Sequence, residues 1–184
     1  SKKIGRILTE EEAEAEEKKG NRVTEVEGGF RRVVATPKPE DIIELDSIKA
    51  LLDADNVVIA CGGGGIPVLV QDNKLRGASA VIEKDTAAGH MADLLEADML
   101  IMLTGTEKVY LNYGTDEAEA LDFISVEDAR RYIEEGRFEQ GTMAPKIQAA
   151  IDYIGDSAVR KVLITKLNPG KPSIAGSTGT MIGK

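Results

Sequence analysis

The sequence predicts an α/β fold, a three-layer α/β/α sandwich around a largely parallel sheet, with an additional small protruding subdomain. From residue 39 to residue 184, apolar runs typical of buried strands alternate with stretches of helical periodicity. Such alternation produces parallel strands joined by right-handed crossovers and covered on both faces. Residues 1–38 are more polar, and the stiff segment Thr36-Pro37-Lys38-Pro39 marks where they end. We therefore expect a protruding subdomain at 1–38 and the α/β domain at 39–184.

The first 38 residues predict one helix and one β-hairpin. Thr9 and Glu12 have the spacing of a capping box for a helix over 10–19, which a glycine ends. Strands over 23–26 and 30–34 flank a glycine-containing turn. Because the helix has almost no apolar face, we expect it to lie on the surface.

The remaining residues predict strands and helices in turn. Apolar residues on one helical face indicate a helix over 42–54, and the apolar run 57–61 indicates a buried strand. Asp85 is placed to cap the next helix, and Ser125 and Pro145 mark the starts of two more. The expected elements, in order, are helix 42–54, strand 57–61, a hairpin with strands over 66–70 and around 75, helix 86–96, strands 99–103 and 109–111, helices 125–136 and 145–154, buried strand 162–165 and edge strand 180–182.

Charge and cysteine content restrict the class of protein. The chain carries 23 Lys and Arg against 32 Asp and Glu, a formal net charge of −9, which argues against a general nucleic-acid or membrane-surface binder. The single cysteine, Cys61, allows no disulfide framework, and its apolar surroundings favour a buried small side chain over a nucleophile. No apolar run approaches membrane-spanning length, so we expect a soluble, unexported, cytoplasmic protein.

Four consecutive glycines form the first candidate ligand site. They are Gly62, Gly63, Gly64 and Gly65, directly after the expected strand 57–61. A turn without side chains exposes backbone N–H groups, which can form a nest for a phosphate or carboxylate. The pattern matches neither G-x-G-x-x-G nor a Walker loop, and a flexible turn without a ligand is the alternative interpretation.

Two lysines lie at expected helix starts, where the helix dipole disfavours a cation. Lys146 falls in the first turn of the helix 145–154, and Lys84 directly precedes Asp85. A bound anion would reverse the sign of this interaction, so a phosphate site accounts for both lysines and for the glycines expected at the same sheet edge. In the alternative interpretation each lysine is solvated and Asp85 is a plain helix cap, and His90 is expected to be structural.

Several motifs occur in an informative order along the chain. They are Cys61-Gly62-Gly63-Gly64-Gly65-Ile66-Pro67-Val68, Leu75-Arg76-Gly77, Ala80-Val81-Ile82-Glu83-Lys84-Asp85, Asn112-Tyr113-Gly114, Gly141-Thr142-Met143-Ala144-Pro145-Lys146 and Gly179-Thr180. In this order and spacing, the chain resembles carbamate kinases, a branch of the amino-acid kinase family. The resemblance extends over essentially all 184 residues.

This resemblance implies a kinase that transfers a phosphoryl group between ATP and carbamate, usually toward ATP from carbamoyl phosphate and ADP, with Mg²⁺ accompanying the nucleotide. By motif, Lys84 and Lys146 would neutralise the transferring phosphoryl oxygens and Asp85 would orient them. Lys2 would approach the substrate from the protruding subdomain. Phosphoryl transfer mainly requires such positioning and charge, and no side chain is assigned to a metal.

The resemblance also implies a role for the domain 39–184 in binding the nucleotide. Thr104, Tyr110 and Met143 fall where the family holds it. The same resemblance leads us to expect small-molecule substrates, a homodimer built on the sheet domain and a place in arginine metabolism.

The chain departs from the family in several places. Family members carry a long amino-terminal half with two further glycine-rich phosphate loops, and nothing here corresponds to it, so we expect the 184 residues alone to be inactive. Gly28 stands where the family usually has arginine, which bears on the acceptor. Other differences are Lys3 for proline, Glu83 for aspartate and Arg137 for histidine. Two alternatives are a kinase of the same superfamily with another small acceptor, and a non-catalytic nucleotide-binding or assembly module.

Overall fold

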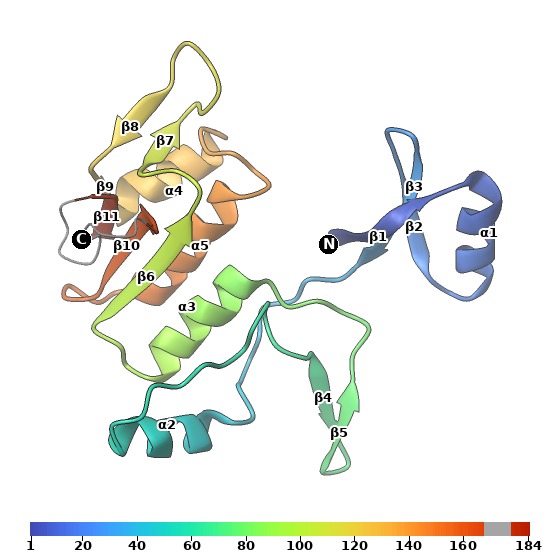
Figure 1. The fold of residues 1–184 in the computed structure, drawn as a ribbon, viewed down its shortest axis with the longest axis horizontal. Coiled ribbons are helices and arrows are strands. Elements are labelled where there is room, and N and C mark those ends of the chain that lie inside the picture. The colour runs from blue at the N-terminus through green and yellow to red at the C-terminus, as the bar shows by residue number, and fades with distance from the viewer. Residues whose placement is uncertain (168–177) are drawn as a thin grey trace. The chain divides into compact units, whose positions relative to one another are not determined.

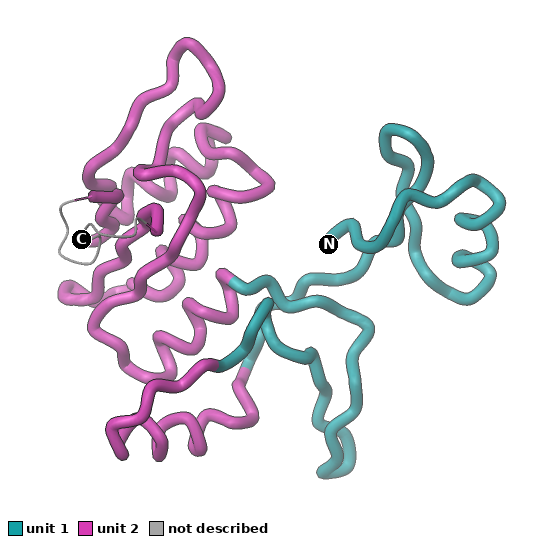
Figure 2. The backbone as a smooth tube through the Cα atoms, viewed as in Figure 1, with its two compact units in different colours: residues 1–40, 60–84 teal, residues 41–59, 85–184 magenta. Residues whose placement is uncertain are grey.

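The chain divides into two compact units. The computed structural model describes residues 1–167 and 178–184. Unit 1 contains Ser1–Glu40 and Ala60–Lys84, and unit 2 contains Asp41–Ile59 and Asp85–Lys184 (Figure 2). Strands and helices occur in both units, which confirms the α/β class (Figure 1). The division into a subdomain at 1–38 and a nucleotide-binding domain at 39–184 stays a prediction.

Unit 1 contains a three-stranded antiparallel sheet with one helix, and a separate hairpin. The sheet has the order β1-β3-β2. The predicted capping box is confirmed, since the Thr9 side chain accepts from the Glu12 N–H and the Glu12 side chain accepts from the Thr9 N–H. Only Ala13 of the helix is buried, so the helix lies on the surface as expected. The elements are β1 (Lys2–Leu8), α1 (Glu10–Lys18), β2 (Arg22–Val26), β3 (Gly29–Val34), β4 (Val68–Gln71) and β5 (Lys74–Gly77).

The predicted buried strand at 57–61 is wrong. This segment has no strand pairing within the described part of the chain, and Val57 and Ile59 are 95% and 96% exposed. A strand needs a neighbour that takes up its backbone hydrogen bonds, and an apolar pattern alone does not provide one. Cys61, expected to be buried, is only half-buried and has φ of 59°.

Unit 2 is built on a four-stranded sheet of order β6-β10-β11-β9. Strand β10 pairs in parallel with β6 and antiparallel with β11, which pairs in parallel with β9. The prediction that 180–182 forms an edge strand is therefore wrong, because β9 takes the edge position. The strands of this unit are β6 (Met99–Thr104), β7 (Val109–Leu111), β8 (Glu119–Leu121), β9 (Phe123–Ser125), β10 (Lys161–Lys166) and β11 (Thr180–Gly183).

The core of unit 2 lies between one face of this sheet and three of its helices. Met102, Val162 and Ile164 share that face by register and belong to one buried cluster with residues of α3, α4 and α5. On the opposite face, Leu103 and Phe123 are 52% and 55% exposed, so a third layer stays a prediction. The helices are α2 (Leu45–Asp53), α3 (Lys84–Leu94), α4 (Val126–Glu134) and α5 (Met143–Ile154).

Helices α3 and α5 pack at close range. A Cβ atom added to Gly89 would lie 3.0 Å from the carbonyl oxygen of Ala149. A residue without a side chain therefore allows the two helix backbones to approach each other. One turn earlier on each helix lie Asp85 and Lys146, and this close packing brings the two side chains together.

Candidate active site

A buried ion pair connects the first turns of α3 and α5. The Lys146 ammonium donates to Asp85 Oδ1 at 2.7 Å. Lys146 is 7% exposed and Asp85 is 9% exposed. Lys146 is therefore not a solvated surface side chain, and its position in the first turn of a helix is as predicted.

Asp85 does not cap α3, which corrects the sequence-based expectation. The helix begins at Lys84, one residue before Asp85, rather than at residue 86. A buried ammonium requires a counter-charge, and the Asp85 carboxylate provides it. The anion that the dipole argument required near Lys146 is thus supplied by the protein itself. Lys84 lies exposed at the start of the same helix.

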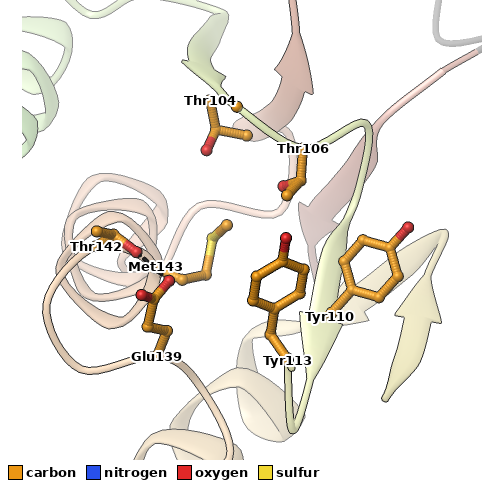
Figure 3. A pocket seen from close by; sticks show the side chains of 8 residues that line it. Thr104, Thr106, Tyr110, Tyr113, Glu139, Thr142 and Met143 are labelled. Carbon is orange, nitrogen blue, oxygen red and sulfur yellow. Dashed lines mark hydrogen bonds between the residues drawn. The ribbon is translucent and has the colours of Figure 1, made fainter. Parts of the chain in front are cut away.

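A pocket of about 210 Å³ opens beside the first turn of α5. Thr104, Tyr110 and Met143, the residues expected to hold a nucleotide, all line it, and Figure 3 shows the Met143 side chain pointing toward the tyrosine rings. The rings of Tyr110 and Tyr113 lie 5.6 Å apart at 56°. Aromatic and thioether surfaces of this kind suit a flat, apolar group such as a nucleotide base.

Five of the lining residues were not among the predicted site residues. They are Gly105, Thr106, Tyr113, Glu139 and Thr142. Glu139 organises the start of α5, because its carboxylate accepts from the Thr142 hydroxyl at 2.5 Å and its carbonyl accepts from the Met143 N–H at 3.1 Å. An acidic residue three positions before Thr142, at a predicted helix start, is the sequence signal that could have found this contact.

The pocket and the buried ion pair share one helical turn. Met143 lines the pocket, and Lys146 follows it by three residues on α5. Residues three apart lie on the same face of a helix. A flat group that fills the pocket would thus lie one helical turn from Lys146.

The glycine turn belongs to a second cluster, in unit 1. A Cβ atom added to Gly64 would lie 1.9 Å from the carbonyl oxygen of Ile82, so the turn packs directly on the segment 82–84. The Gly62 N–H donates to the Ala60 carbonyl and the Gly64 N–H to the Cys61 carbonyl, at 2.8 Å each. The prediction that the turn exposes its N–H groups to an anion is therefore wrong for these two groups. Of the other predicted residues, Lys2 reaches Glu83 of this segment at 2.9 Å. Proximity of this cluster to Lys146 stays a prediction.

The described residues contain neither a cluster of metal ligands nor a membrane-spanning helix. Within 1–167 and 178–184, no three His, Cys, Asp or Glu side chains gather as a metal site. Over the same ranges, no helix combines the length and the apolar content that crossing a bilayer requires. His90 is half-buried, and its Nε2 atom has no hydrogen-bond partner within these ranges.

Comparison with known proteins decides the family. The amino acid kinase family matches residues 8–166. The chain belongs to this family. A carbamate kinase-like protein of Escherichia coli (strain K12) is 52% identical over 183 residues, which are 99% of this chain and 59% of that protein. A carbamate kinase of Clostridium perfringens is 44% identical over 186 residues, with 100% of this chain and 59% of that protein covered.

Solved structures agree with this assignment to the amino acid kinase family. The structure described as carbamate kinase from Giardia lamblia bound to AMP-PNP superposes with a TM-score of 0.89 at 34% identity. The match covers 100% of this chain and 59% of that one. The chain thus spans about three fifths of the length of these relatives.

Proposed function

We propose that the parent protein of this chain is a carbamate kinase and that these 184 residues supply its nucleotide site. The observation that carries the proposal is the buried Lys146/Asp85 pair, one turn from a pocket lined by two tyrosines and a methionine. The similarity to carbamate kinases over the whole chain supports the same reaction.

In the direction of ATP synthesis, a terminal phosphate oxygen of ADP bonds to the phosphorus of carbamoyl phosphate. The bond between phosphorus and the carbamate oxygen breaks, and its electron pair leaves with carbamate. Such a transfer needs alignment and positive charge on the transferring oxygens. Lys146, fixed by Asp85, and Lys84 at the start of α3 supply this charge in the proposal, and Lys2 acts from unit 1.

The nucleotide base occupies the pocket between Tyr110 and Met143, near Thr104, in this proposal. Mg²⁺ would be held mainly by the nucleotide phosphates, because it commonly keeps its waters and needs few protein ligands, and it would supply positive charge there. The same proposal includes a three-layer sandwich, the division at residue 38, a homodimer, a cytoplasmic location and a role in arginine metabolism.

The test is ATP formation from ADP and carbamoyl phosphate by the full-length parent protein. We expect Lys84→Ala and Lys146→Ala each to lower kcat/KM by about 10²-fold or more, the size found for removing a charge-stabilising group. Lys84 is exposed, so Lys84→Ala tests the role without disturbing the core. Lys18→Ala, which removes an exposed lysine paired with Glu14, is the matched control and should leave the rate unchanged.

Three outcomes contradict parts of the proposal. Near-wild-type rates for both variants would refute the site assignment. Binding of ADP without transfer to any small acceptor would favour a nucleotide-binding module. Transfer to a different small acceptor, with carbamoyl phosphate inert, would favour another kinase of the family, in line with Gly28 at the position of the usual arginine.

A further inference from the structure

Unit 1 holds an ion pair between residues far apart in the sequence. The Lys2 ammonium lies 2.9 Å from Glu83 Oε1 and 3.1 Å from Glu83 Oε2. The Lys2 side chain is 47% exposed and the Glu83 side chain is 29% exposed. Exposed pairs of this kind typically contribute little to stability.

Backbone pairing connects the segments that carry the two residues. Lys2 lies opposite Val34 in the ladder between β1 and β3. The next residue after β3, Ala35, forms a parallel bridge with Ala80, and the Val81 N–H donates to the Ala35 carbonyl at 2.9 Å. Lys2 therefore lies in a strand, and backbone pairing at Ala80 and Val81 fixes the segment just before Glu83.

Glu83 also lies where the elements of the unit 1 cluster meet. The glycine turn packs on the carbonyl of Ile82, the residue before Glu83, and Lys84 is the residue after it. An ammonium has three N–H groups, so even a contact with both Glu83 oxygens leaves one N–H of Lys2 to donate to a further anion.

We propose that Glu83 is a positioning residue that holds the Lys2 ammonium in place to donate to the carbamoyl phosphate anion. This inference rests on the proposed function. Glu83 does not touch the reacting atoms; it acts through Lys2. Its carboxylate limits the rotamers of a long, flexible side chain before the substrate arrives, which lowers the entropy lost on binding.

The test is a double-mutant cycle with Lys2→Met and Glu83→Gln in the full-length parent protein. We expect each single variant to lower kcat/KM for carbamoyl phosphate about tenfold, and the double variant to be no worse than Lys2→Met, because contacting residues are coupled. The KM for ADP should not change. Glu83→Asp keeps the carboxylate and should restore most of the loss. Glu14→Gln, at an exposed Lys–Glu pair on α1 of the same unit, is the matched control.

The outcomes separate this inference from the proposed function. If wild type makes no ATP from carbamoyl phosphate, the proposed function fails and the inference fails with it. If wild type turns over but the two single effects multiply in the double variant, Glu83 does not act through Lys2 and only the inference is overturned. The inference is also overturned if Glu83→Gln leaves the kinetics unchanged. The same holds if Glu83→Gln raises the KM for ADP as much as it lowers kcat/KM for carbamoyl phosphate.

Discussion

Two lysine–carboxylate pairs of nearly equal length lie in very different surroundings. The Lys146/Asp85 contact in unit 2 measures 2.7 Å with side chains 9% and 12% exposed, and the Lys2/Glu83 contact in unit 1 measures 2.9 Å with side chains 47% and 29% exposed. Distance alone would rank them as similar interactions. Burial separates them, because removing one partner strands an uncompensated charge only where water cannot replace it.

The two units differ in burial beyond these ion pairs. Among the described residues, the buried apolar side chains of unit 1 are only Ala13 and Ile82, whereas unit 2 contains one continuous cluster of buried residues. Unit 1 is held mainly by backbone ladders and exposed ion pairs, and unit 2 by a packed core. Replacing a buried side chain should therefore lower the stability of unit 2. In unit 1, substitutions that strain the backbone should have the larger effect on stability.

The largest expected change in stability comes from breaking the buried Lys146/Asp85 pair. Lys146→Met leaves the Asp85 carboxylate unpaired in the core, and we expect it to lower the free energy of unfolding by about 3–5 kcal/mol. Adding Asp85→Leu removes the stranded charge and should restore most of the loss. Urea unfolding measures both values, with the exposed Lys18→Met as control. A loss below about 1 kcal/mol for the single variant would show that the pair is not shielded from water.

The second effect concerns the backbone of unit 1. Gly64 has φ of 139°, and an added Cβ would meet the Ile82 carbonyl at 1.9 Å, so Gly64→Ala should destabilise unit 1 by about 1–3 kcal/mol. At Gly63 an added Cβ meets nothing within 4 Å, and Gly63→Ala serves as the control. Amide hydrogen exchange of β3 in unit 1 is the readout. Equal effects of the two substitutions would contradict the close packing of the turn.

A smaller effect is expected at the exposed pair. Lys2→Met should lower the free energy of unfolding by less than about 1 kcal/mol, because solvent replaces the lost contact. Urea unfolding beside the Lys146 variant gives the comparison directly. A loss as large as that of Lys146→Met would mean that Lys2 has a structural role.

The smallest effect is a pH dependence at α1. Hydrogen bonds from the Arg6 guanidinium lower the pKa of Glu12 from 4.5 to about 2. A lowered folded-state pKa means that the stabilisation is complete above 4.5 and is lost as the pH falls toward 2. Carbon NMR titration of the Glu12 carboxyl should show this pKa, and Arg6→Gln should raise it. A wild-type pKa near 4.5 would contradict the contact.

Local signals were sufficient for much of the fold. The capping box at Thr9, the cap at Ser125 and the apolar strands over 99–103 and 162–165 were all found at or within a residue or two of their places. These features depend on neighbours a few residues away, which the sequence shows directly. The pocket residues Thr104, Tyr110 and Met143 were identified through resemblance rather than through periodicity, and the structure brings them together.

The sequence by itself determined where most helices lie to within a few residues and which lysines stand at helix starts, since hydrogen bonding and periodicity over a few residues decide these. The tertiary structure alone decided that Asp85 is the counter-ion of Lys146 rather than a cap, that Lys2 meets Glu83, and that 57–61 is not a strand. The reason is physical: burial and pairing depend on which distant segments come into contact, and no pattern within one segment specifies its partner.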